Sequence, residues 1–178
     1  MNTSSSFFLY GRVTAFNTIK TVENELEDHT MQGAKLYEAH LNSSNIERSI
    51  IFYEKLGFKV AYTTEDRKAA FFFLGENKEN MLGIWETKDT PIERNHIAFS
   101  VSPEKLRGNI PFLKEKEIEV RESLGLSPSE PIVHSWIPAA SVYFYDPDGH
   151  SLEYIAVLEG EAKPYLNPMH LSEWENLS

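Results

Sequence analysis

Apolar positions along residues 35–160 change from alternating to helical spacing and back again, and this order occurs twice. Each copy is typical of a strand, a helix and three further strands. Gly57 fits the C-terminal cap of the first helix, and Ser102 with Pro103 fits the start of the second. The first copy is predicted at residues 36–41, 46–56, 58–64, 69–74 and 81–86, and the second at residues 96–101, 103–116, 119–122, 141–145 and 151–158.

The repeat predicts an α+β fold built from two βαβββ modules, at about residues 35–90 and 91–160. Residues 124–138 contain proline and serine and are expected to form a loop. The sequence Asp-Pro-Asp-Gly at 146–149 is a strong turn signal between the last two strands.

The regions outside the repeat have no comparable pattern. Residues 1–34 are expected to be an N-terminal extension, with a candidate strand at residues 7–16. Residues 161–178 are expected to be a C-terminal tail that packs on the surface of the domain. The whole chain is therefore interpreted as one domain with additions at both ends.

The composition excludes several classes of function. The 178 residues include no cysteine, so any bound metal is expected to have His, Asp, Glu or backbone oxygen ligands. The net charge of −10 disfavours a nucleic-acid partner, because an acidic surface repels phosphate backbones. Apolar runs are only strand-sized and no secretory signal is visible, so we expect a cytoplasmic protein with no membrane partner.

Three segments carry a family resemblance: NIERSIIFYEKLGF at residues 45–58, NHIAFSV at 95–101 and VYFYDPDGHSLE at 142–153. In this order they resemble the vicinal oxygen chelate superfamily, which includes glyoxalase I, fosfomycin-resistance proteins, bleomycin-binding proteins and extradiol dioxygenases. The resemblance covers about residues 36–158. It implies that the paired modules form a curved mixed sheet or partial barrel around a metal site.

The resemblance implies that His96 and Glu153 are metal ligands, because each matches a ligand position of the family's second module. An imidazole and a carboxylate suit a divalent ion, and this donor set does not distinguish zinc, nickel, manganese and iron(II). The family's first ligand matches Glu38, but His40 lies two residues later on the same face of the strand. Either residue is a candidate ligand, and the one that is free of metal is expected to be catalytic by moving a proton.

Three positions depart from individual members of the superfamily. Glyoxalase I has a glutamate on the fourth strand that binds metal and transfers a proton, whereas the matching residue here is Gly83, and Glu86 faces the other side. Tyr143 matches a substrate-contacting tyrosine of the fosfomycin-resistance proteins. Their phosphonate-binding cations are absent, because Val133 and Ala162 lie near the matching positions.

The candidate substrate-binding residues are Trp85, Tyr143 and Trp136, with His134 beside Trp136 at the rim of the pocket and His150 expected to be structural. We expect a metal-dependent lyase or isomerase, similar to lactoylglutathione lyase, that acts on a small oxygenated molecule or its thiol conjugate. The alternative is a protein of the bleomycin-resistance type that sequesters a drug or metabolite in an aromatic cleft without catalysis. The resemblance also implies a homodimer in which modules from two chains complete each site.

Overall fold

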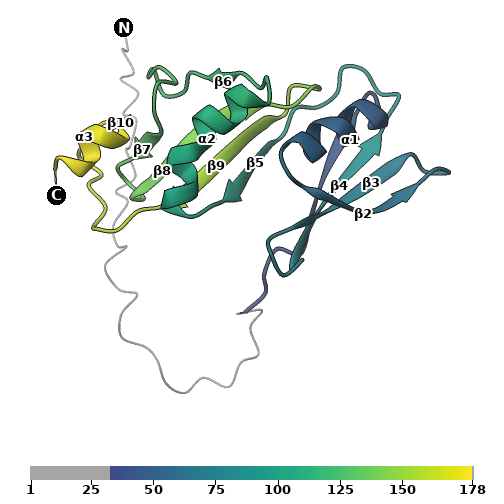
Figure 1. Cartoon of the computed structure of the whole chain (residues 1–178), viewed down its shortest axis with the longest axis horizontal. Helices are drawn as coiled ribbons and strands as arrows, with labels where there is room; N and C mark the ends of the chain where they lie inside the picture. Colours follow the sequence, from purple (N-terminus) through teal and green to yellow (C-terminus); the bar gives the residue numbers. More distant parts are fainter. Residues whose placement is uncertain (1–32, 178) are drawn as a thin grey trace, which may run out of the picture. The chain divides into compact units, whose positions relative to one another are not determined.

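The first copy of the repeat forms a four-stranded mixed sheet with one helix packed on it (Figure 1). Its elements are β1 (Glu38–Ser43), α1 (Ile46–Lys55), β2 (Lys59–Thr64), β3 (Ala69–Leu74) and β4 (Asn80–Glu86). The strand order is β1-β4-β3-β2, with β1 parallel to β4 and the other pairs antiparallel. This computed structural model describes residues 33–177.

The second copy forms a six-stranded sheet of the same design, with two additional short strands and one additional short helix. Its elements are β5 (His96–Ser100), α2 (Pro103–Glu115), β6 (Val120–Arg121), β7 (Ile132–His134), β8 (Ala139–Tyr145), β9 (Ser151–Val157), β10 (Met169–His170) and α3 (Leu171–Glu175). The main strand order is β10-β7-β8-β9-β5. β6 also pairs with β8, at residues 143 and 144, whereas β7 pairs with residues 139–141 of β8. As β1 does in the first sheet, β5 lies at an edge and runs parallel to its neighbour, here β9.

The two helices begin and end where local side-chain chemistry dictates. The Asn45 side chain accepts a hydrogen bond from the backbone N–H of Arg48 at the start of α1. Ser102 caps α2 in the same way, with proline at the first helical position. Gly57 follows α1 with a φ of 88°, a left-handed conformation that glycine adopts without steric cost.

The predicted α+β architecture of paired modules is confirmed, and within residues 33–177 the two mixed sheets do not close into a barrel. Several predicted boundaries were wrong. β8 begins at Ala139 rather than at residue 141. The first strand covers residues 38–43 rather than 36–41, because its pairing with β4 continues to Ser43 opposite Glu86. The predicted loop at 124–138 contains β7, whose three residues are too few to show a periodicity and form a strand because they pair with β8.

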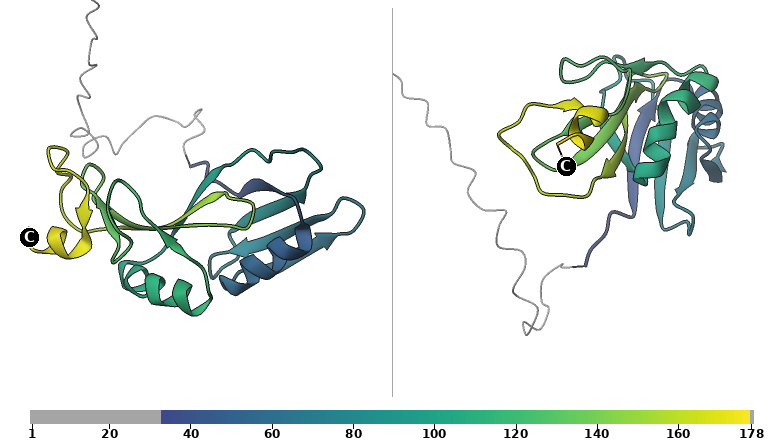
Figure 2. Two further views of the ribbon diagram at one scale, coloured as in Figure 1. Left: turned by 90° about the horizontal axis from the view of Figure 1, so that it is seen from above. Right: turned by 60° about the vertical axis from the view of Figure 1, so that its left-hand side comes forward.

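Figure 2 shows α1 and α2 on the same side of the two sheets. The core lies between these helices and the sheet faces that they cover. Phe72 of β3, Leu106 of α2 and Phe144 of β8 are completely buried there. The opposite sheet faces, which the helices do not cover, are therefore the faces on which polar residues can act.

The ends of the chain differ in how far the structure describes them. The expected extension at 1–34, including its candidate strand at 7–16, lies outside the described residues apart from positions 33 and 34. The C-terminal segment belongs to the same compact unit as the modules, residues 36–178. Its residues Leu171 and Trp174 are buried. Among residues 33–177, no helix has the length and apolarity needed to cross a membrane.

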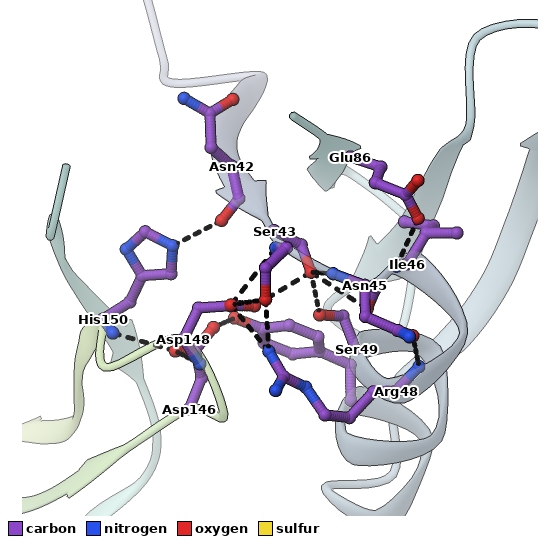
Figure 3. Close-up of polar contacts among 12 residues, drawn as sticks. Asn42, Ser43, Asn45, Ile46, Arg48, Ser49, Glu86, Asp146, Asp148 and His150 are labelled. Atoms are coloured by element: carbon purple, nitrogen blue, oxygen red, sulfur yellow. Dashed lines mark hydrogen bonds and ion pairs between the residues drawn. The ribbon is translucent and has the colours of Figure 1, made fainter. Parts of the chain in front are cut away.

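The turn between β8 and β9 packs against the start of α1 and so joins the two modules (Figure 3). Asp148 Oδ1 accepts hydrogen bonds from the Ser44 backbone N–H at 3.1 Å, from Ser44 Oγ at 2.6 Å and from Arg48 Nη2 at 2.6 Å. Burial opposes ionisation of Asp148, but these hydrogen bonds outweigh it and hold the pKa of the carboxyl below its ordinary value. Asp148 is thus a charged anchor between the modules.

Three buried polar residues, Tyr53, Asp146 and His150, lie next to this anchor. The Tyr53 hydroxyl donates to Asp146 Oδ2 at 3.0 Å, and the backbone N–H of His150 donates to Asp146 Oδ1 at 2.8 Å. His150 is fully buried, and its Nε2 lies 2.7 Å from the carbonyl oxygen of Asn42 (Figure 3). These contacts are structural, as expected for His150.

Candidate metal centre

The parallel pairing of β5 with β9 places His96 beside Glu153. In this register His96 lies opposite Ser151, and Ala98 lies opposite Glu153. His96 Nε2 is 2.9 Å from Glu153 Oε2, and its Nδ1 is 3.1 Å from both the carbonyl oxygen and Oγ of Ser151. Ser151 therefore orients the imidazole so that Nε2 faces the carboxylate.

The Glu153 carboxylate is buried, with 6% of its side chain exposed, whereas half of the His96 side chain is exposed. Ser141 Oγ donates a hydrogen bond to Glu153 Oε1, and His134 Nε2 lies 3.9 Å from the same oxygen. Burial lowers the pKa of His134, and attraction to Glu153 only partly opposes this, so His134 is neutral at neutral pH. Within residues 33–177, Glu153 has only imidazoles as ionic partners.

Tyr143 lies over this pair on β8, directly opposite Glu153. Its hydroxyl is 2.8 Å from His134 Nε2, and its ring centroid is 6.4 Å from that of His96. Burial and the charge of Glu153 raise the pKa of Tyr143 to about 12, so its hydroxyl keeps its proton and can donate. Trp136 packs edge-to-face on His134, at 5.0 Å between ring centroids. Of the three candidate substrate-binding residues, Tyr143 thus lies beside the pair, and Trp136 lies against His134, which is 3.9 Å from Glu153 Oε1.

A second acidic–imidazole pair lies on the first sheet. His40 Nε2 is 2.9 Å from Glu38 Oε1, and both side chains are partly exposed. His40 lies opposite Gly83 in the β1–β4 register. A methyl group in place of the Gly83 hydrogen would lie 2.6 Å from His40 Cδ2, so the imidazole occupies the space of a β4 side chain. Gly83 therefore allows His40 to lie across β4.

Aromatic rings surround His40 on this face. Its ring centroid is 5.7 Å from that of Trp85 and 6.2 Å from that of Phe71. Tyr62 lies 6.5 Å from Phe71 and is 62% exposed. Trp85, the third candidate substrate-binding residue, therefore lies with the Glu38–His40 pair and its aromatic surroundings.

The structure brings the predicted site residues together as two pairs, His96 with Glu153 and Glu38 with His40. Within residues 33–177 of one chain, no group of three or more His, Cys, Asp or Glu side chains is placed to hold a metal. Glu86 faces away from this site, as expected, and accepts hydrogen bonds from Lys68 Nζ and the backbone N–H of Ile46. The grouping of Glu38 with His96 and Glu153 stays a prediction.

Sequence reasoning missed two residues beside the His96–Glu153 pair. Ser141 precedes Tyr143 by two positions, so the alternation of strand residues could have indicated that it shares the same face. Arg121 on β6 lies opposite Tyr143. No sequence pattern could place it there, because a long segment separates β6 from β8 and the sequence does not indicate which residues of the two strands pair.

Paired βαβββ modules, with an imidazole and a buried carboxylate facing each other on the second sheet, define a two-module α+β protein with a candidate metal centre. The family model of the Glyoxalase/Bleomycin resistance protein/Dioxygenase superfamily matches residues 27–154. The chain belongs to this superfamily.

Individual relatives agree with this assignment. The metallothiol transferase FosB of Staphylococcus haemolyticus is 33% identical over 141 residues, which cover 70% of this chain and 89% of the relative. The solved integron cassette protein HFX_CASS4 from the Halifax Harbour sewage outfall is 28% identical with a TM-score of 0.59, covering 69% of this chain and 98% of that one. The fosfomycin resistance protein FosX of Listeria monocytogenes shares the fold, with a TM-score of 0.54 and 23% identity over 75% of this chain and 98% of that one.

Proposed function

We propose that this chain is a divalent-metal-dependent enzyme that acts on a small oxygenated substrate in a reaction involving a thiol. Relatives 33% identical to the chain are metallothiol transferases, which supports transfer of a thiol to the substrate. The superfamily assignment also supports glyoxalase-like lyase or isomerase chemistry on a thiol conjugate. Both reactions would use the same metal centre, and assays with different substrates distinguish them.

The buried carboxylate of Glu153 carries this proposal. A carboxylate among apolar neighbours is costly without a compensating positive charge, and its ionic contacts among residues 33–177 are imidazoles. A divalent cation supplies that charge, and one imidazole nitrogen with carboxylate oxygen is a donor set that zinc, nickel, manganese and iron(II) accept. The residues present therefore fit a metal held by His96 and Glu153.

The metal, when bound, polarises substrate oxygens and stabilises negative charge that develops on them. Ser151 fixes the orientation of His96, and Ser141 donates to Glu153 so that the carboxylate keeps its position. Tyr143 presents a protonated hydroxyl close to the same pair. In the Glu38–His40 pair, Nε2 of His40 donates to Glu38 Oε1, which leaves Nδ1 of His40 to accept or return the proton.

We propose that the active form is a homodimer, in which Glu38 and His40 of one chain face His96 and Glu153 of the other. Support comes from the separation of the donors into two pairs on two sheets of one chain. It also comes from the apolar side chains exposed on the sheets, such as Tyr62 and Tyr145. Sedimentation at micromolar concentration that shows only a 20.4 kDa species would contradict the dimer.

Metal binding and activity test the proposal together. The chain is stripped with a chelator, reloaded with zinc, nickel, manganese or iron(II), and analysed for metal content. Transfer is assayed with a low-molecular-weight thiol and a small epoxide, and isomerisation with a hemithioacetal. We expect Glu153→Gln to lose metal and activity together, whereas the exposed control Glu159→Gln keeps both. Absence of activity with every metal would reject the proposed enzyme.

Mixing two inactive variants tests the shared site. Glu153→Gln is combined with the double variant Glu38→Gln, His40→Gln, and the subunits are allowed to exchange. If each site uses both chains, heterodimers contain one intact site, and about a quarter of all sites regain activity in an equal mixture. If all ligands come from one chain, mixing restores nothing.

The aromatic rings around His40 support a second candidate, a binding protein without catalysis. Trp85, Phe71 and Tyr62 form an aromatic surface suited to an aromatic drug or metabolite. This candidate predicts that no metal is found by elemental analysis, that metal leaves the melting temperature unchanged, and that aromatic ligands quench the fluorescence of Trp85. The variant Trp136→Phe would still show the quenching, and Trp85→Phe would not.

A further inference from the structure

Arg121 is a cation on the same sheet face as the candidate metal centre. It lies opposite Tyr143, which in turn lies opposite Glu153, so the three residues share one face across β6, β8 and β9. The Arg121 guanidinium carbon is 4.9 Å from the ring centroids of both Tyr143 and Tyr145. The two aromatic rings restrict the guanidinium to one position.

The hydrogen-bond partners of Arg121 are neutral and leave donors unused. Nη2 donates to Ser151 Oγ at 2.7 Å, and Nη1 donates to the carbonyl oxygen of Glu122 at 3.1 Å. Nε is buried and has no partner among the described residues. In contrast to Arg48 and Arg107, Arg121 makes no ion pair within residues 33–177. An arginine in this state has both charge and directed N–H groups available.

The charge balance of the chain makes this arrangement informative. A net charge of −10 offers many carboxylates as partners, yet Arg121 is held between tyrosines with none of the described carboxylates paired to it. The planar guanidinium fork matches the two oxygens of a carboxylate or phosphonate. A small oxyanion therefore has the charge and geometry that match this guanidinium.

We propose that Arg121 binds an anionic group of the substrate, a carboxylate or a phosphonate, next to the metal centre. Ser151 connects the two sites, because its Oγ accepts from Arg121 and lies 3.1 Å from His96 Nδ1. An anion bound to Arg121 is thus connected to His96 through a single residue, Ser151. The inference rests on the proposed function and defines its substrate class as small oxygenated anions.

Arg121 also replaces cations that the sequence lacks elsewhere. Positions 133 and 162 carry valine and alanine. Val133 is fully buried, so no charge could be placed there without loss of the core. Arg121 provides the positive charge from β6 instead.

Anion binding is measured on the metal-free full chain by NMR, with the arginine side-chain Nε–H signals observed. Acetate and methylphosphonate are titrated as the two oxyanions, and acetamide as the neutral match for acetate. We expect a saturable shift of the Arg121 Nε–H signal with both anions and none with acetamide. Equal shifts with acetamide, or a response confined to other arginines, would overturn the inference.

Variants separate binding from structural support. Arg121→Gln is expected to weaken anion binding at least tenfold, as reported by the Ser151 backbone amide, whereas Arg121→Lys retains part of it. Arg67→Gln makes the same charge change in an exposed turn and should bind as the parent does. Unaltered anion affinity in a folded Arg121→Gln protein would show that the guanidinium only joins strands.

The outcome is distinguishable from failure of the proposed function. Glu153→Gln is expected to lose metal and still bind acetate, because the anion contacts Arg121 rather than the metal ligands. In the loaded enzyme, Arg121→Gln should raise KM for an anionic epoxide at least tenfold more than it raises KM for a neutral epoxide. Anion binding without any activity would refute the proposed enzyme but support anion binding by Arg121. Activity with equal preference for both epoxides would support the enzyme but refute the role of Arg121.

Discussion

The imidazole of His40 lies across Gly83 of the neighbouring strand, at a distance that leaves no room for a side chain at position 83. A Cβ atom there would be 2.6 Å from His40 Cδ2, 3.0 Å from its Nε2 and 3.1 Å from Phe71 Cε1. The imidazole of His40, from β1, therefore fills the space that a side chain at position 83 of β4 would take. The Glu38–His40 contact depends on this arrangement.

The first prediction concerns Gly83→Ala. The added methyl group pushes the half-exposed His40 ring outward, so we expect a loss of about 1 kcal/mol in the free energy of unfolding. Activity should fall more than tenfold, because the group that we propose to transfer the proton is displaced. Urea unfolding and steady-state kinetics measure the two effects. Gly108→Ala is the control, since nothing lies within 4 Å of its added methyl group; parallel losses in both variants would argue against the contact.

The second prediction concerns the buried hydroxyl of Tyr53. Removing it in Tyr53→Phe takes a donor from the buried carboxylate of Asp146, which should cost about 1–3 kcal/mol in the free energy of unfolding. Tyr154→Phe removes a hydroxyl for which the described residues show no hydrogen bond, and should cost well under ~1 kcal/mol. Urea denaturation of both variants gives the comparison, and equal losses would refute the role of the Tyr53–Asp146 bond.

The third prediction concerns acid and the Asp148 anchor. Hydrogen bonds hold the folded-state pKa of Asp148 below the ordinary 3.8, so the unfolded chain binds the proton more readily. The stability that its charge contributes is therefore present above about pH 4 and is lost as the pH falls through the folded-state pKa. The difference in free energy of unfolding between the parent and Asp148→Asn should shrink toward acid. A difference that stays constant from about pH 6 to pH 2 would contradict the anchor.

The fourth prediction concerns Ser141, which donates a hydrogen bond to Glu153 Oε1. Ser141→Ala leaves the carboxylate less well oriented, so metal affinity should fall about tenfold while the fold is retained. Competition with a chelating dye measures the affinity. Ser100→Ala is the matched control, because Ser100 is an exposed residue of β5. Metal affinity that is unchanged in Ser141→Ala would remove Ser141 from the site.

Agreement between sequence and structure is closest where a signal is local. Ser102 and Pro103 predicted the start of the second helix, Gly57 predicted the end of the first, and the turn at 146–149 predicted the last hairpin. The alternation of strand residues also placed Glu38 and His40 on one face, as their 2.9 Å contact shows. Each of these signals acts over a few residues of chain.

Agreement ends where pairing between distant strands decides the outcome. The three residues of β7 are too few to carry a pattern, and they form a strand only because β8 offers hydrogen-bonding partners. Arg121 lies on the same sheet face as the candidate metal centre because β6 pairs with β8 in a register that places it opposite Tyr143. Burial of Glu153 likewise depends on neighbours that come from other strands.

The sequence by itself determined the paired βαβββ order, the ends of its helices and the residue types available to a metal, because periodicity, capping and side-chain chemistry are local properties. Only the tertiary structure decided which side chains meet: His96 with Glu153, His40 across Gly83, and Arg121 between two tyrosines. These contacts depend on strand register, and a shift of one residue would turn each side chain to the opposite face of its sheet.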